Sequence, residues 1–68
     1  MKIEYSAHSI ARMRQRGITS LEVEYVIKYP KITRRISERI EFIGTLQNRT
    51  IKIVATQSEN NIKIITVM

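Results

Sequence analysis

Three side chains near the N-terminus have the chemistry and the spacing of a phosphate-binding helix face. His8, Arg12 and Arg16 follow one another at intervals of four residues, so a helix places them in one stripe about 12 Å long, opposite its Ile10 and Met13 side. Guanidinium groups bind phosphate oxygens bidentately, and an imidazole can transfer a proton near neutral pH. The stripe is therefore either a phosphate site with a proton-transfer group or, more simply, the solvated polar face of a helix.

Further basic residues lie elsewhere on this helix and in two groups along the chain. Arg14 lies on another side of the same predicted helix. The two groups comprise Lys31, Arg34, Arg35, Arg39, Arg49, Lys52 and Lys63. Some of these residues must share one face of a predicted sheet. Two interpretations of that face stay open. It either receives a partner protein, a second copy or a stacked base, or it holds cross-strand charges that keep the protein soluble.

The composition favours an anionic partner in a reducing compartment. Twelve Lys and Arg residues against six Glu give these 68 residues a net charge of +6. The absence of Cys excludes disulfide-rich scaffolds, thiolate zinc sites and thiol catalysis, and a cytoplasmic location is expected. The longest apolar runs are far shorter than the roughly 20 residues that cross a bilayer, so no membrane association is expected.

The sequence predicts neither a metal nor a cofactor. The single His8 and the scattered Glu residues lack the spacing of metal ligands. Gly17 and Gly44 are too few for a glycine-rich phosphate loop, and no glycine-rich elbow accompanies a serine nucleophile.

Two helices are predicted in the N-terminal half. The first begins after a Ser6 cap, buries Ala7, Ile10, Ala11 and Met13, and ends at Gly17. Thr19 and Glu22 form a capping-box pattern for the second, whose apolar face is Val23, Val26 and Ile27, flanked by Leu21 and Tyr25. Pro30 ends this helix near Tyr29.

After Pro30 the apolar residues alternate, which indicates strands at residues 40–46, 51–56 and 62–67. Residues 31–37 and 2–5 are candidates for additional short strands. Because short loops join the main strands, they should form an antiparallel meander. The expected fold is a single α+β domain over residues 1–68, with two N-terminal helices packed on one face of a three- to four-stranded antiparallel sheet.

The alternation also assigns side chains to the two faces of the sheet. If Ile51, Ile53 and Ala55 cover the core, then Lys52, Val54 and Thr56 lie on the opposite face, together with Lys63, Ile65 and Val67. Tyr25 and Phe42 are expected in the core. Tyr5 and Tyr29 lie at the ends of elements, where they either stack a base or are partly buried.

The run from His8 to Ile18, followed by Val23 and Tyr29-Pro30, resembles a family of small bacterial and archaeal domains of unknown function with an H-[AS]-x-x-R-M-x-x-R-G-I pattern. The resemblance continues through residues 49–54 and the closing strand, so it covers almost the whole chain. That family is grouped with BrnT-like and RelE-like toxins of toxin–antitoxin systems, within the barnase, EndoU, colicin and RelE fold of metal-independent ribonucleases.

The resemblance implies an endoribonuclease toxin that needs no cofactor. His8 would be the general base or acid, Arg12 and Arg16 would clamp phosphate, and Arg49 and Lys52 would stabilise the developing oxyanion. Contacts to RNA are expected from Arg14, Arg34, Arg35, Arg39, Lys52 and Lys63. The implied partners are RNA, including messenger RNA on the ribosome, and a cognate antitoxin.

Two alternatives stay open beside the enzyme. In the first, the same cations bind RNA without cleaving it and His8 only packs. In the second, the domain binds another protein, or a second copy of itself, through its open sheet face or an edge strand. The second proton-transfer group that cleavage needs is also open, with Tyr5, Tyr29 or a Lys as candidates.

Overall fold

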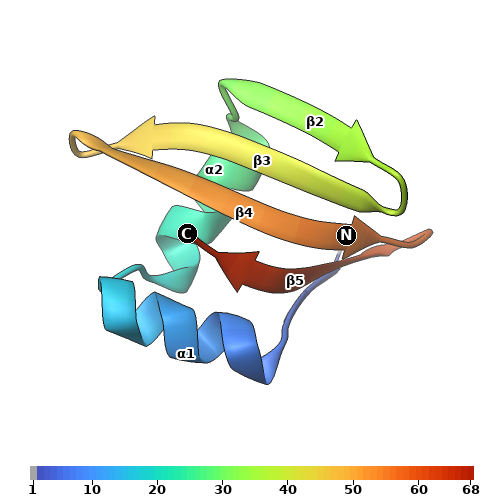
Figure 1. Cartoon of the computed structure of the whole chain (residues 1–68), viewed down its shortest axis with the longest axis horizontal. Coiled ribbons are helices and arrows are strands. Elements are labelled where there is room, and N and C mark those ends of the chain that lie inside the picture. Colours follow the sequence, from blue (N-terminus) through green and yellow to red (C-terminus); the bar gives the residue numbers. More distant parts are fainter. Residues whose placement is uncertain (1) are drawn as a thin grey trace.

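The structure, a computed structural model, describes residues 2–68, which form two helices and five strands. In chain order these are β1 (Lys2–Tyr5), α1 (Ala7–Arg16), α2 (Ser20–Lys28), β2 (Ile32–Ile36), β3 (Arg39–Leu46), β4 (Arg49–Gln57) and β5 (Asn61–Val67). The strands form one sheet in the order β1-β5-β4-β3-β2. α1 packs against β5, and α2 packs against β3 and β4 and passes behind them in Figure 1. The α+β class with two helices on a sheet is therefore confirmed.

The number of strands and their directions differ from the expectation. Strands β2 to β5 form the predicted antiparallel meander, but the sheet has five strands rather than three or four. The fifth, β1, pairs in parallel with β5, with Ile3 opposite Ile62 and Tyr5 opposite Ile64. Its alternation of exposed and half-buried residues is short, and its partner lies almost sixty residues away. Because that pairing is non-local, local periodicity could not predict its direction.

A register shift between β4 and β5 changes the predicted face of the last strand. Ala55 pairs with Ile64 and Val54 pairs with Thr66, so Ile65 is an extra residue in β5. Val67, expected on the outer face, consequently points into the core and is fully buried. Thr56 pairs with Lys63 on the face opposite the core, as predicted.

Helix α1 has the predicted ends but buries a different side. The Oγ of Ser6 accepts a hydrogen bond from the Ser9 N–H, and Gly17 ends the helix in the left-handed region at φ 65°. The buried residues of α1 are Ser9 and Met13, whereas Ile10 is 41% exposed. Ser9 tolerates burial because its Oγ donates to the Ser6 carbonyl at 2.7 Å. The small Ser9 therefore faces the sheet where an apolar residue was expected.

Helix α2 has the predicted capping box, in which the Thr19 N–H donates to the Glu22 carboxylate at 2.8 Å. Val23 and Val26 are buried and join the core cluster. Tyr25, expected in the core, is instead 45% exposed and lies beside Tyr29 with 5.2 Å between the ring centroids. The buried face of α2 is narrow because it rests on two strands only, which leaves Tyr25 outside the contact.

One apolar cluster joins both helices to the same face of the sheet. Phe42 is buried there, as predicted, beside Ile53 of the neighbouring strand. The buried members of the cluster are Met13, Ile18, Val23, Val26, Ile40, Phe42, Ile51, Ile53, Ala55, Ile62, Ile64 and Val67. Because residues of α1 and β4 belong to this one core, the two elements are held in a fixed relative position.

Candidate functional site

The stripe of His8, Arg12 and Arg16, called the α1 stripe below, lies along one flank of α1. His8 and Arg12 each directly precede a buried residue, Ser9 or Met13, so the stripe borders the buried side and is not opposite Met13 as expected. His8 and Arg16 are exposed, whereas Arg12 is half-buried. The Nε of Arg12 is fully covered and has no hydrogen-bond partner among the described residues. Packing thus holds the side chain of Arg12, as far as its Nε, against the rest of the protein.

Arg49 is brought to the end of the α1 stripe by the fold. Its guanidinium Nη2 donates to the carbonyl oxygen of Arg16 at 2.9 Å, across 33 positions of the sequence. Carbonyl groups at the C-terminal end of a helix carry partial negative charge, which favours a cation there. Arg49, at the start of β4, therefore extends the stripe beyond the last turn of α1. Its charge also helps to lower the pKa of Glu22, after the larger effect of the Thr19 N–H.

The other predicted RNA contacts lie on different surfaces. Arg14 is exposed on another side of α1. Arg34 and Lys52 both pair with Glu41, at 3.8 Å and 3.4 Å, on the sheet face away from the helices. That face also carries Arg39 and Lys63, whose strands both pair with β4 at Thr56. The predicted cations thus form no single site.

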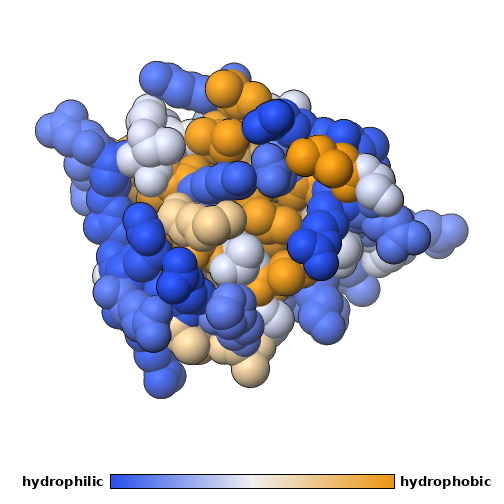
Figure 2. Space-filling model, viewed as in Figure 1, coloured by the Kyte–Doolittle hydropathy of each residue, from blue (hydrophilic) through white to orange (hydrophobic). Residues whose placement is uncertain are grey.

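The sheet face without helices mixes apolar and charged side chains. Cross-strand pairing places Ile32 beside Ile43, and it places Glu41 between Arg34 and Val54. Figure 2, which looks onto this side, shows an apolar patch crossed and bordered by hydrophilic groups, with a further hydrophilic band over α1. The predicted half-apolar outer face is therefore present.

The cations of the protein are largely uncompensated. Of the twelve Lys and Arg side chains, Arg34 and Lys52 form ion pairs, and within residues 2–68 the other ten form none. Such charges repel one another unless counterions or an anionic partner approach. The described surface thus carries a large excess of unpaired positive charge.

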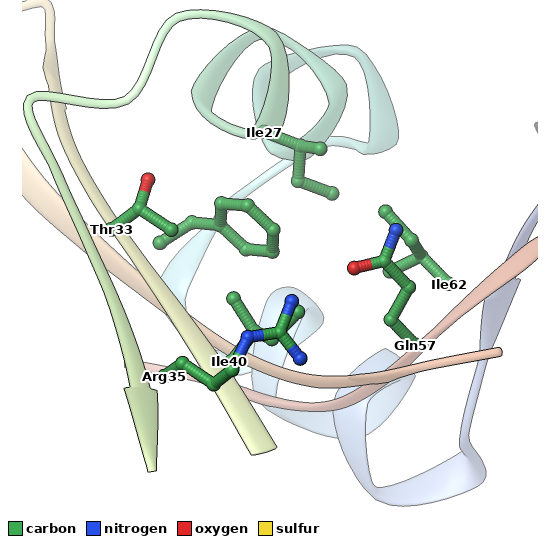
Figure 3. Close-up of a pocket in the computed structure, with 7 residues that line it drawn as sticks. Ile27, Thr33, Arg35, Ile40, Gln57 and Ile62 are labelled. Atoms are coloured by element: carbon green, nitrogen blue, oxygen red, sulfur yellow. The ribbon is translucent and has the colours of Figure 1, made fainter. Parts of the chain in front are cut away.

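A pocket of about 220 Å³ lies on the helix side of the sheet, between the C-terminal half of α2 and the edge strand β2. We call it the α2–β2 pocket; its lining residues are Ile27, Thr33, Arg35, Ile40, Phe42, Gln57 and Ile62. In Figure 3 the Arg35 guanidinium and the Gln57 amide extend toward the centre from opposite sides. Arg35 was predicted to bind RNA, but the pocket was not predicted. The pocket forms because the side of β2 that carries Thr33 and Arg35 faces α2. The local pattern of residues 31–37 does not specify which side of the strand does so.

Tyr5, a candidate for the second proton-transfer group, is unsuited to that role. Its hydroxyl is covered and lacks a hydrogen-bond partner among the described residues. Burial raises the pKa of Tyr5 above its ordinary value, and the charge of Glu24 raises it further. The phenol therefore stays protonated and out of reach of a bound molecule.

No helix among residues 2–68 combines the length and hydropathy of a membrane span, and no group of acidic or histidine side chains there gathers as metal ligands would.

Comparison with known proteins identifies the family of the chain. Residues 5–68 match the sequence profile of a domain of unknown function, DUF4258. The chain belongs to the DUF4258 family. No curated protein and no solved structure matches it. The α1 stripe, Arg49 and the α2–β2 pocket all lie within the DUF4258 match.

Proposed function

We propose that this DUF4258 domain is an endoribonuclease toxin of the RelE-like and BrnT-like kind, which binds RNA at the α1 stripe and cleaves it without a metal. The observation that carries the proposal is the hydrogen bond from Arg49 to the Arg16 carbonyl. It joins a strand-borne cation to a helix stripe that already contains an imidazole and two guanidinium groups. The excess of unpaired cations supports a polyanionic substrate.

In the proposed reaction the ribose 2′-oxygen attacks the adjacent phosphorus. His8 removes the proton from the 2′-hydroxyl, the bond from phosphorus to the 5′-oxygen breaks, and that oxygen takes a proton from water. Arg12 and Arg16 hold the phosphate, and Arg49 stabilises the charge that develops on its oxygens. The products are a 2′,3′-cyclic phosphate and a 5′-hydroxyl. A cognate antitoxin would restrain this activity in the cytoplasm.

The test is cleavage of single-stranded RNA by the purified protein in a buffer that contains a metal chelator. His8→Ala should lower the rate about 10²- to 10⁴-fold, as the loss of a general base does. Arg12→Ala should also lower it. The matched control is Arg14→Ala, an exposed arginine on another side of α1, which should retain most of the rate.

Growth arrest on expression of the wild type, relieved by His8→Ala with the fold intact, would support the toxin assignment. A wild type that binds RNA in a salt-sensitive way but yields no product would replace the enzyme by an RNA-binding module.

A second candidate function is binding of a partner protein, and one observation favours it. Leu21, Tyr25 and Tyr29 recur every four residues on the outer side of α2 and are all exposed. The Lys28 ammonium group lies 5.6 Å from the centre of the Tyr29 ring. Exposed aromatic residues next to a cation are typical of protein interfaces. Loss of complex formation in Tyr25→Ser, with RNA cleavage unchanged, would assign this surface to the antitoxin.

A further inference from the structure

The α2–β2 pocket has apolar walls and three polar lining residues, Thr33, Arg35 and Gln57. Ile27, Ile40 and Ile62 supply the walls together with the Phe42 ring, and the Arg35 guanidinium and Gln57 amide point inward from β2 and β4 (Figure 3). Arg35 forms no ion pair with the described residues. An unpaired cation over an apolar hollow favours an anionic molecule with an apolar, ring-like part.

The volume of the pocket limits what it holds. Sites for drug-sized ligands usually measure about 300–1,000 Å³, whereas this pocket has about 220 Å³. It is therefore suited to one ring system and too small for a complete nucleotide cofactor. Groups attached to the ring must lie outside, at the rim where Arg35 is located.

The polar groups distinguish between the occupants of this size. The Gln57 amide offers both a hydrogen-bond donor and an acceptor, and the Arg35 guanidinium offers donors only. A nucleobase has apolar faces, a polar edge that pairs with an amide, and a phosphate one sugar away. A single apolar side chain of a docking peptide would leave the Gln57 amide without a role. The chemistry of the pocket thus matches a nucleobase better than a peptide side chain.

We propose that the α2–β2 pocket binds one unpaired base of the RNA, with Gln57 at the base edge and Arg35 at its phosphate. This inference rests on the proposed function and specifies its substrate class as single-stranded RNA. In a duplex the bases are stacked and paired, so none is free to enter a pocket on the protein. Duplex RNA would contact only cations outside the pocket.

The experiment compares two forms of the same RNA, a single-stranded oligonucleotide and its duplex, by titration of the full-length protein. Gln57→Ala and Arg35→Gln should each weaken binding of the single strand about tenfold, in the range that loss of one base contact produces. Neither variant should change binding of the duplex by a comparable factor. The matched control is Arg34→Gln, the neighbouring arginine on the opposite face of β2, which should affect both forms equally.

A second measurement tests the pocket with mononucleotides in place of the oligonucleotide. Amide NMR shifts on addition of uridine or adenosine 3′-monophosphate should be centred on Thr33, Phe42 and Gln57, and ribose 5-phosphate should not reproduce them. If the wild type cleaves RNA and neither Gln57→Ala nor Arg35→Gln changes the rate, the base site in the pocket is refuted and the proposed function still holds. Nucleotide binding in the pocket without any binding of RNA would refute the proposed function and, with it, the assignment of the pocket to a base of RNA. An acidic peptide that fills the pocket where nucleotides do not would assign it to a protein partner and refute the base site.

Discussion

Tyr5 shows how a single buried group affects the stability of this fold. Its ring packs against the core, but its hydroxyl has no hydrogen-bond partner among the described residues. A buried polar group without a partner costs about 1–3 kcal/mol. We therefore expect Tyr5→Phe to raise the free energy of unfolding by about 1 kcal/mol, measured by urea denaturation.

The same variant tests the assignment of proton transfer. Because the covered phenol cannot reach RNA, Tyr5→Phe should cleave RNA at the wild-type rate. A large loss of rate with unchanged stability would show instead that Tyr5 takes part in the reaction.

The carboxylate of Glu22, at the start of α2, makes the stability of the fold depend on pH. The Thr19 N–H holds the pKa of Glu22 below its ordinary value, against the opposing effect of partial burial. A lowered pKa in the folded state means that the charged carboxylate stabilises the fold above the pKa of the unfolded chain. This contribution is lost as the pH falls through the lowered pKa.

We expect the unfolding free energy of the wild type to fall with acid more steeply than that of Glu22→Gln, because glutamine keeps the capping bond without titrating. Thermal denaturation between neutral and acidic pH measures the difference. Parallel curves for the two proteins would contradict the role of the capping box.

Residue types and spacing allowed part of the candidate site to be predicted. The intervals of four between His8, Arg12 and Arg16 correctly placed them on one side of α1. Their position relative to the core could not be predicted, because Ser9 is a polar residue that is nevertheless buried, with its Oγ bonded to the Ser6 carbonyl. The contact of Arg49 with Arg16 required the tertiary fold.

At the scale of elements, the contact between α2 and β3 depends on Gly44. A Cβ at this position would lie 3.1 Å from a methyl group of Val26. Val26 must shift by a few tenths of an ångström to admit this methyl group, and the packed core around it resists the shift. We therefore expect Gly44→Ala to lower the unfolding free energy by about 1 kcal/mol, at the lower end of the cost of overpacking. The measurement is chemical denaturation of the single variant.

A double variant identifies the cause of that loss. Val26→Ala removes the opposing methyl groups, so Gly44→Ala should cost less in that background than in the wild type. Additive effects of the two substitutions would place the cost in the backbone of β3 and not in its contact with α2.

The elements themselves were largely predictable, and their assembly was less so. Alternation identified the three long strands, and Ser6, Gly17 and Thr19 marked helix ends where the structure has them. The extra residue Ile65 could not be foreseen, because a bulge depends on the partner strand. It reversed the predicted side of Val67.

At the scale of the whole molecule, the number of phosphates that the cations neutralise determines how binding responds to salt. If Arg12, Arg16, Arg35 and Arg49 each neutralise one phosphate, the logarithm of the affinity for single-stranded RNA should fall with the logarithm of salt concentration with a slope of about −3. Arg49→Gln should reduce that slope by about 0.7, and Arg14→Gln should leave it unchanged. Dissociation constants between about 50 and 200 mM salt measure both values. A slope near zero would exclude a nucleic-acid role.

The parallel pairing of β1 with β5 affects how the protein acquires its surface during synthesis. β1 emerges from the ribosome well before the strand beside it, Asn61–Val67, because almost sixty residues separate the two. The hydroxyl of Ser6, at the start of α1, likewise donates to the carbonyl of Ile65 at 2.9 Å. Until those residues leave the exit tunnel, α1 has no sheet to pack on and Arg49 has no fixed helix end to meet. A nascent chain therefore carries no finished α1 stripe until β5 has left the exit tunnel.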